Sequence, residues 1–239
     1  MKLLFLGHAY TNGCRTQYFF PLLRAKGARP EYVELPSGPE RLKVLQGLPK
    51  ADTALLQRIA LSETELAELR RHAGRLVYDV DDPIMYRSSR HLIQRSLPRR
   101  RRFERMVRSV DRVIASSPLI AEEAGRYMRA DCIDLIPSTV DASAYLPPPS
   151  RPTNPEITIG WLGSAGTVPY LAKLRQVLAE AGRRWPQARL KIVSNRFPDL
   201  EGIPIERKPW AQADEAADLA SFDIALLPLS DDLWTRGKG

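Results

Sequence analysis

Short runs of apolar and β-branched residues alternate along the chain with longer segments in which apolar residues recur every three or four positions. The short runs predict buried β-strands, and the longer segments predict amphipathic helices that cover a sheet. The strands are expected at residues 3–6, 32–35, 53–56, 76–80, 113–115 and 133–136, and then from Ile157 and at 190–193, 203–206 and 224–227. Strands that alternate with helices favour a parallel sheet with helices on both faces, so the predicted fold class is α/β.

Local signals mark the start of several helices. Ser62 and Glu65 have the spacing of a capping box. Ser117 and Pro118 suit the N-cap and the first position of another helix. Apolar residues at helical spacing over 171–184 predict one continuous helix after the strand that begins at Ile157.

A proline-rich stretch divides this pattern into two parts. Three consecutive prolines, 147–149, are followed closely by Pro152 and Pro155, which is typical of a stiff linker. We therefore expect two domains, residues 1–146 and 156–239, joined by residues 147–155. The second is short for a domain, and the sequence stops just after a loop that should lead into another helix. We expect it to be incomplete, in a fragment or a truncated product.

A loop of small residues follows the strand that begins at Ile157. It contains Gly163, Ser164, Ala165 and Gly166, and it leads into the next predicted helix. Free backbone N–H groups and the positive end of a helix dipole make such a loop suitable for a phosphate. The glycines are spaced G-x-x-G rather than G-x-G-x-x-G, so an NAD site is not favoured. An ordinary strand-to-helix turn is the alternative interpretation.

An acidic sequence, Asp79-Val80-Asp81-Asp82, ends the fourth predicted strand. As a D-x-D motif, Asp79 and Asp81 would hold Mg²⁺ or Mn²⁺ on a donor diphosphate. Alternatively, Asp81 or Asp82 orients or deprotonates an acceptor hydroxyl. The simplest interpretation is that these residues cap the loop, because Asp before Pro is common in turns.

Composition narrows the class of protein. Hydrophobic residues make up 44% of the 239 residues and charged residues 27%, as in ordinary globular domains. Cys14 and Cys132 are far apart and fit a reducing compartment. The N-terminal apolar run is too short for a signal peptide. No segment approaches the ~20 apolar residues of a membrane span. We therefore expect a cytoplasmic protein.

The net charge of +8 is concentrated in one segment, because ten arginines lie between Arg87 and Arg112 against Glu104 and Asp111. Within it, a predicted helix carries an arginine stripe of Arg101, Arg105 and Arg108 opposite an apolar face of Phe103, Met106, Val107 and Val110. A solvated face is the simplest interpretation. Attraction of Arg99–Arg108 to anionic lipid headgroups is the sharper one, and it would place the protein peripherally at the inner face of the membrane. Nucleic-acid binding is not expected, because no aromatic interleaving or recognition motif accompanies the arginines.

A series of short motifs resembles those of one enzyme family. In the first half they are Arg15 ahead of aromatic residues 18–20, ALLQR at 54–58, VYDVDD at 77–82, VIASS at 113–117 and IPSTVD at 136–141. In the second half they are IGWLGS at 159–164, FDI at 222–224, PL at 228–229 and WTRGK at 234–238. In this order the motifs resemble the retaining, nucleotide-sugar-dependent glycosyltransferases of family 4 (group 1). That family has the GT-B fold of two Rossmann-like, doubly wound domains.

The resemblance implies that the second domain binds the donor's nucleotide diphosphate and the first binds a sugar or lipid-linked acceptor, with no cofactor or metal. The residues expected to bind the diphosphate are Gly163, Ser164, Gly166, Thr167, Arg236 and Lys238. For Arg236 and Lys238, the alternative interpretation is that they lie in a solvated tail and bind no ligand. His8, Asn12 and Arg15 are expected on the acceptor side, and Asp81 and Asp82 are the candidate catalytic residues.

The sequence departs from the family pattern at one point. Family members continue into a helix whose acidic residues contact the donor sugar, and no such segment follows Gly239. We therefore expect the 239-residue chain to have little or no transferase activity. The alternatives are a non-catalytic remnant with partial nucleotide binding and a metal-dependent, GT-A-like transferase that uses Asp79 and Asp81.

Overall fold

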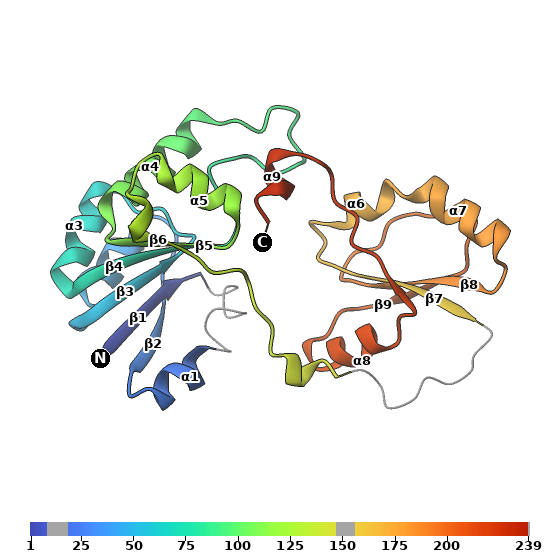
Figure 1. Cartoon of the computed structure of the whole chain (residues 1–239), viewed down its shortest axis with the longest axis horizontal. Coiled ribbons are helices and arrows are strands. Elements are labelled where there is room, and N and C mark those ends of the chain that lie inside the picture. The colour runs from blue at the N-terminus through green and yellow to red at the C-terminus, as the bar shows by residue number, and fades with distance from the viewer. Residues whose placement is uncertain (9–18, 147–155, 239) are drawn as a thin grey trace. The chain divides into compact units, whose positions relative to one another are not determined.

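The computed structural model describes residues 1–8, 19–146 and 156–238, which form two compact units (Figure 1). The first unit comprises Met1–Val140 together with Asp231–Gly239, and the second comprises Asp141–Ser230. Each unit is built on its own parallel β-sheet with helices on both faces. The predicted α/β class with two Rossmann-like, doubly wound units is confirmed.

The first unit contains a six-stranded sheet in the order β2-β1-β3-β4-β5-β6. Its strands are β1 (Lys2–Gly7), β2 (Arg29–Glu34), β3 (Ala51–Gln57), β4 (Ala73–Val80), β5 (Arg112–Ala115) and β6 (Ile133–Leu135). The helices between them are α1 (Phe19–Ala25), α2 (Glu40–Gln46), α3 (Glu63–His72), α4 (Leu97–Ser109) and α5 (Pro118–Gly125), with a 3₁₀ turn at Ala130–Cys132. Helices α3, α4 and α5 cover one face of the sheet and α1 covers the other (Figure 1).

Alternation along β1 divides the core of this unit into two parts. Leu4 and Leu6 face the large core beneath α3, α4 and α5. Leu3 and Phe5 face the opposite side, where the rings of Phe5 and Phe20 are 4.8 Å apart. Successive side chains of a strand point to opposite faces, so one apolar strand supplies both cores.

Helix α4 confirms the predicted amphipathic helix. Phe103, Met106 and Val107 are buried against the sheet, and Val110 follows as its C-cap. The capping box at Ser62 and Glu65 and the N-cap at Ser117 are also present. Among the described residues, no helix combines the length and hydrophobicity that crossing a bilayer requires.

The second unit contains a four-stranded sheet in the order β10-β7-β8-β9. Its strands are β7 (Ile157–Leu162), β8 (Ala188–Val193), β9 (Ile205–Lys208) and β10 (Ile224–Ala225). Its helices are α6 (Val168–Ala172), α7 (Arg175–Arg184) and α8 (Glu215–Ala220), with 3₁₀ turns at Ala142–Ala144 and Gln212–Asp214. Helices α6 and α7 lie on one face and α8 on the other (Figure 1).

Three predicted elements of the second unit differ from the structure. The helix expected over 171–184 is two helices, because Lys173 and Leu174 donate to residues three positions earlier and end α6. Strand β9 lies two residues later than expected. Strand β10 has only two residues, since pairing with β7 stops after Ala225.

The residues from Asp231 onward pack on the first unit, although the sequence pattern assigned them to the second domain. They contain helix α9 (Leu233–Arg236), whose N-cap Asp232 accepts a hydrogen bond from Ser89 Oγ at 3.0 Å. The carbonyl of Gly237 accepts another from Ser117 Oγ at 3.0 Å. A Cβ on Gly237 would lie 2.5 Å from Pro83, so only glycine allows this close approach. The expected linker, 147–155, is outside the described residues.

Candidate functional site

A group of polar residues lies at the carboxyl ends of β1, β3 and β4. The chain leaves β1 towards α1 on one face of the sheet and leaves β3 towards α3 on the other. Such a reversal between neighbouring strands is where open α/β sheets bind ligands. His8 follows β1, Arg58 follows β3, and Asp81 and Asp82 follow β4.

Arg58 joins the two candidate catalytic carboxylates. Its Nε lies 3.0 Å from Asp81 Oδ1, and its Nη1 lies 3.0 Å from Asp82 Oδ2. All three side chains are partly exposed. A guanidinium that contacts two carboxylates fixes their orientation at a surface that a ligand can reach.

The backbone of Arg58 is also unusual. Its φ is +57°, in the left-handed region that non-glycine residues rarely adopt, and its N–H donates to the carbonyl of Asp79 at 3.0 Å. Arg58 belongs to one of the motifs that carry the family resemblance, but it was not predicted as a site residue. The available signal was a charged residue directly after a buried strand.

The two cations expected to bind the donor diphosphate lie in the C-terminal segment on the first unit. Lys238 Nζ is 3.2 Å from Asp82 Oδ1, so Asp82 contacts both Lys238 and Arg58. Arg236 donates two hydrogen bonds to Asp231, at 2.6 and 2.9 Å. In this structure both cations therefore have carboxylate partners within the first unit.

The three carboxylates of the acidic motif differ in their exposure to solvent. Asp79 is fully buried, whereas Asp81 and Asp82 are partly exposed. The buried hydroxyl of the neighbouring Tyr78 has its pKa raised by desolvation and by the charge of Asp81. Within the described ranges, no group of three or more His, Cys, Asp or Glu side chains has a metal-binding arrangement.

Of the predicted acceptor-side residues, the structure describes His8. Its Nδ1 lies 3.1 Å from the carbonyl oxygen of Leu35, and its own carbonyl accepts a hydrogen bond from Tyr32 Oη at 2.7 Å. These contacts hold His8 against Tyr32 in β2 and against Leu35, the residue that follows β2. Asn12 and Arg15 are outside the described residues.

The predicted donor loop, residues 163–167, leaves β7 next to β10, at the strand reversal of the second sheet. Thr167 donates to the carbonyl of Ser164 through both its N–H and its Oγ1, each at 2.9 Å. Ser164 and Gly166 are exposed. A Cβ on Gly163 would lie 2.4 Å from the Trp161 ring, so packing alone accounts for this glycine. Helix α6 after the loop has only five residues, so its dipole is weaker than the continuous predicted helix would supply.

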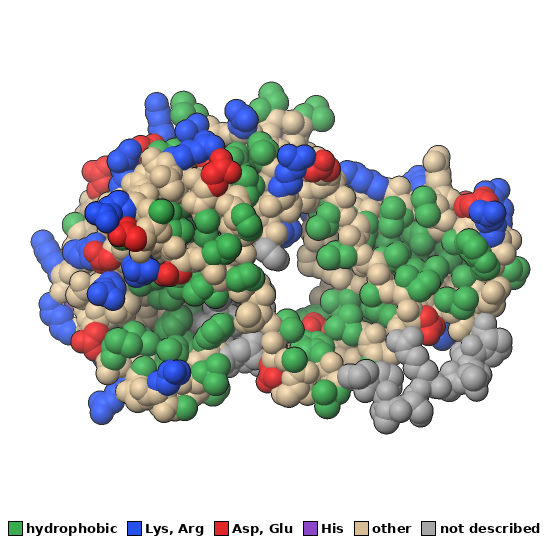
Figure 2. Space-filling model, in the orientation of Figure 1, with side chains coloured by type: hydrophobic (Ala, Val, Ile, Leu, Met, Phe, Trp, Pro, Cys, Tyr) green, Lys and Arg blue, Asp and Glu red, His purple; other side chains and the backbone are tan. Residues whose placement is uncertain are grey.

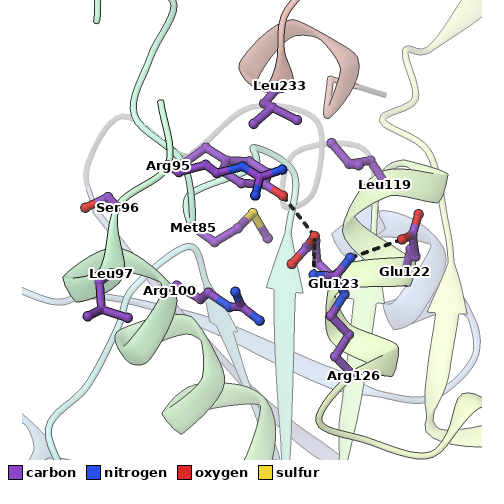
Figure 3. A pocket seen from close by; sticks show the side chains of 11 residues that line it. Met85, Arg95, Ser96, Leu97, Arg100, Leu119, Glu122, Glu123, Arg126 and Leu233 are labelled. Atoms are coloured by element: carbon purple, nitrogen blue, oxygen red, sulfur yellow. Dashed lines mark hydrogen bonds and ion pairs between the residues drawn. The ribbon is translucent and has the colours of Figure 1, made fainter. Parts of the chain in front are cut away.

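A pocket of about 370 Å³ in the first unit lies between the loop after β4, α4, α5 and α9 (Figure 3). Met85, Leu119 and Leu233 contribute apolar surface, while Arg95 and Arg126 point towards Glu123. Glu123 Oε1 accepts a hydrogen bond from Tyr86 Oη at 2.8 Å and lies 3.2 Å from Arg126 Nη1.

The chemistry of this pocket depends on the buried Glu123. Burial together with the hydrogen bond to Glu123 raises the pKa of Tyr86 to about 12. Tyr86 therefore stays a neutral hydrogen-bond donor at ordinary pH. This group of residues was not predicted from the sequence, because its members come from four separate segments.

Comparison with known proteins gives a fold but no sequence family. No family model matches the chain, and no curated protein sequence matches it. Among solved structures it resembles sucrose-phosphate synthase from Thermosynechococcus elongatus, with a TM-score of 0.64 and 13% identity over 97% of this chain and 77% of that one. It also resembles the catalytic domain of starch synthase IV from Arabidopsis thaliana bound to ADP and acarbose, with a TM-score of 0.57 and 9% identity over 94% and 77% of the two chains.

A third similar structure is that of an epimerase. UDP-GlcNAc 2-epimerase from Neisseria meningitidis, bound to UDP-GlcNAc, matches with a TM-score of 0.56 and 9% identity over 94% of this chain and 76% of that one. The two synthases are glycosyltransferases of the GT-B fold. Identities this low show a shared fold, which is that of GT-B glycosyltransferases.

Proposed function

We propose that this protein transfers a sugar from a nucleotide-diphosphate-sugar donor to an acceptor hydroxyl, with retention of configuration, as in family 4. The observation that carries the proposal is the GT-B fold, shared with sucrose-phosphate synthase over 97% of the chain. The donor's diphosphate is assigned to the loop 163–167 of the second unit. The acceptor is assigned to the carboxyl end of the first sheet.

The polar cluster on the first unit supports the acceptor assignment. Asp81 and Asp82 are held by Arg58 at the edge of the sheet where ligands bind, and both carboxylates are partly exposed. A fixed carboxylate orients an acceptor hydroxyl and accepts its proton as the new glycosidic bond forms. The bond between the anomeric carbon and the diphosphate breaks at the same time, and the nucleoside diphosphate leaves. Retention requires the acceptor oxygen to attack from the face that the diphosphate leaves. Arg58 is then a positioning residue for these two carboxylates.

Binding of the donor is tested by thermal unfolding with UDP, ADP and GDP, each with and without Mn²⁺. Metal-independent stabilisation by one nucleotide is expected, because amide and cation contacts to a diphosphate need no bridging ion. Stabilisation only with Mn²⁺ would contradict a metal-independent donor site. No stabilisation by any nucleotide would favour a non-catalytic chain.

Catalysis is tested with nucleotide-diphosphate sugars and a panel of sugar and lipid-linked acceptors. Product analysis by NMR gives the anomeric configuration and separates transfer from epimerisation, which is the reaction of one similar protein. In a form of the protein that shows transfer, the variant Asp82→Asn should lower turnover by about 100-fold, the scale of a lost general base. The exposed Asp199→Asn is the matched control. Equal turnover by Asp82→Asn and the unmodified protein would remove Asp82 from the proposal.

A further inference from the structure

Residues 87–102 form a strongly basic region of the first unit, the basic surface. It contains seven arginines and no acidic residue. Arg87, Arg95, Arg101 and Arg102 are exposed, and none of them forms an ion pair with another described residue. Figure 2 shows Lys and Arg side chains next to hydrophobic ones along the side of the first unit that carries α4 and the loop before it.

The loop that begins this surface has a defined structure. An antiparallel bridge between Tyr86 and Arg95 closes it, and the N–H of Arg87 donates to the carbonyl of Gln94 at 2.8 Å. Within the loop, the N–H of His91 donates to the carbonyl oxygen of Ser88 at 3.0 Å. Ser89 Oγ donates to Asp232, which anchors the loop to the C-terminal segment.

This loop and the start of α4 expose large apolar side chains among the arginines. Leu92 is fully exposed, Ile93 is 71% exposed and Leu97 is 60% exposed. Single exposed apolar residues are common, but three within six positions of an anchored loop and helix start are not explained by packing. Arginines at the start of α4 also oppose the positive end of its dipole, so helix stability does not explain them either.

The predicted arginine stripe contributes less than its sequence pattern indicated. Arg105 Nε donates to the carbonyl of Leu61 at 3.1 Å. Arg108 Nε lies 3.1 Å from Glu104, and its guanidinium stacks over the ring of Tyr127 at 5.4 Å. The exposed charge is therefore concentrated before and at the start of α4 rather than along its length.

We propose that the basic surface docks the protein on membranes rich in anionic phospholipid, with Leu92, Ile93 and Leu97 inserted among the headgroups. Arginines supply attraction to the negative surface, and apolar side chains supply burial at the acyl boundary. The charges alone would also suit nucleic acid, but phosphate binding gives no role to exposed leucine and isoleucine side chains. The proposal does not depend on the proposed transfer reaction, because docking is measured without substrate.

Co-sedimentation of the full chain with vesicles tests the proposal. The chain should sediment with vesicles of equal parts phosphatidylcholine and phosphatidylglycerol at low salt, and not with vesicles of phosphatidylcholine alone. Binding should weaken in about 0.5 M salt, because exposed charges are then screened over a few ångströms. The variant R101E/R102E should lower the affinity by about tenfold or more. The variant L92S/I93S should lower it by roughly tenfold as well.

Matched controls come from exposed residues of the second unit. R183E/R184E reverses two adjacent helical arginines, and V177S removes one exposed apolar side chain. Both controls should leave vesicle binding unchanged, and circular dichroism should show that every variant is folded. Failure of the unmodified chain to bind the anionic vesicles would overturn the proposal. Unchanged binding by L92S/I93S, with tight binding of duplex DNA, would instead identify the surface as a nucleic-acid site.

Discussion

The backbone of Arg58 brings one guanidinium to two carboxylates. A left-handed φ of +57° turns the chain sharply after β3, and the side chain then reaches Asp81 and Asp82. Such a conformation costs a non-glycine residue roughly 1–2 kcal/mol. A glycine would remove that cost together with both ion pairs. The cluster at the end of the first sheet is thus formed at the expense of local stability.

Two substitutions separate the backbone effect from the side-chain effect. Arg58→Ala and Arg58→Gly both remove the guanidinium, but only glycine adopts a positive φ without steric cost. We expect Arg58→Gly to be more stable than Arg58→Ala by about 1 kcal/mol in urea unfolding. Both should lose most of any transferase activity. Equal stability of the two variants would contradict the strained conformation.

At the scale of elements, a buried ionic network joins β8, β9 and α8. Asp218 is 2% exposed; its Oδ1 lies 2.9 Å from Lys191 Nζ, and its Oδ2 lies 2.9 Å from Lys208 Nζ. Burial acts to raise the pKa of Asp218, but hydrogen bonds from Lys191 and Lys208 outweigh it and hold this pKa below its ordinary value. The network therefore stabilises the second unit while Asp218 is ionised.

Removal of the charge should destabilise the second unit. Asp218→Asn leaves two lysines facing a neutral amide, and the expected loss is about 3 kcal/mol at neutral pH. The exposed Glu180→Gln, which removes a surface partner of Arg183, should cost less than about 1 kcal/mol. Tryptophan fluorescence suits this measurement, because Trp161, Trp185 and Trp210 all lie in the second unit. A loss no larger for Asp218→Asn than for Glu180→Gln would show that the network is not stabilising.

The same carboxylate predicts a pH dependence. Because its folded pKa is lowered, the stability that Asp218 contributes is complete above its unfolded pKa of about 3.9 and is lost as pH falls through the folded value. Between pH of about 5 and 3, the free energy of unfolding should therefore fall less steeply in Asp218→Asn than in the unmodified chain. Parallel pH profiles for the two proteins would contradict this linkage.

The sequence predicted elements best where one local signal sufficed. Ser62 with Glu65 and Ser117 with Pro118 fix helix starts through hydrogen bonds within a few residues. The break at Leu174 has no such signal, because the apolar spacing continues through it. Strand β9 shifted by two residues because pairing with β8, a contact distant in sequence, decides its register.

At the scale of the whole molecule, the C-terminal segment completes the first unit. Leu233 lines the pocket beside Glu123, and Lys238 reaches Asp82 at the carboxyl end of the sheet. Burial acts to raise the pKa of Asp232, but hydrogen bonds from Thr235, Ser89 and Gln94 outweigh it and lower this pKa. The N-cap of α9 is therefore ionised at neutral pH. This one side chain holds both α9 and the loop anchored by Ser89.

Hydrogen exchange tests this anchoring role. Asp232→Ala removes the capping box of α9 and the contact with Ser89, so amides of Trp234, Thr235 and Arg236 should exchange about tenfold faster. The neighbouring Asp231→Ala removes only the exposed pair with Arg236 and is the control. Unchanged exchange in Asp232→Ala would show that apolar contacts of Leu233 suffice to hold the segment.

The candidate site, like strand β9, was only partly predictable because some of its contacts join residues far apart in the sequence. Asp81 and Asp82 could be found because they directly follow a strongly patterned strand. The contact of Lys238 with Asp82 joins positions 156 residues apart, and no local pattern records it. Arg58 was overlooked because its role depends on a backbone angle that its residue type does not favour.

The polypeptide passes between the two units twice, at Val140–Asp141 and again at Ser230–Asp231. Proteolytic nicking at the first passage would leave a later fragment that still ends in the residues bound to Ser89, Ser117 and Asp82. The two pieces of a nicked chain are therefore expected to co-elute in gel filtration.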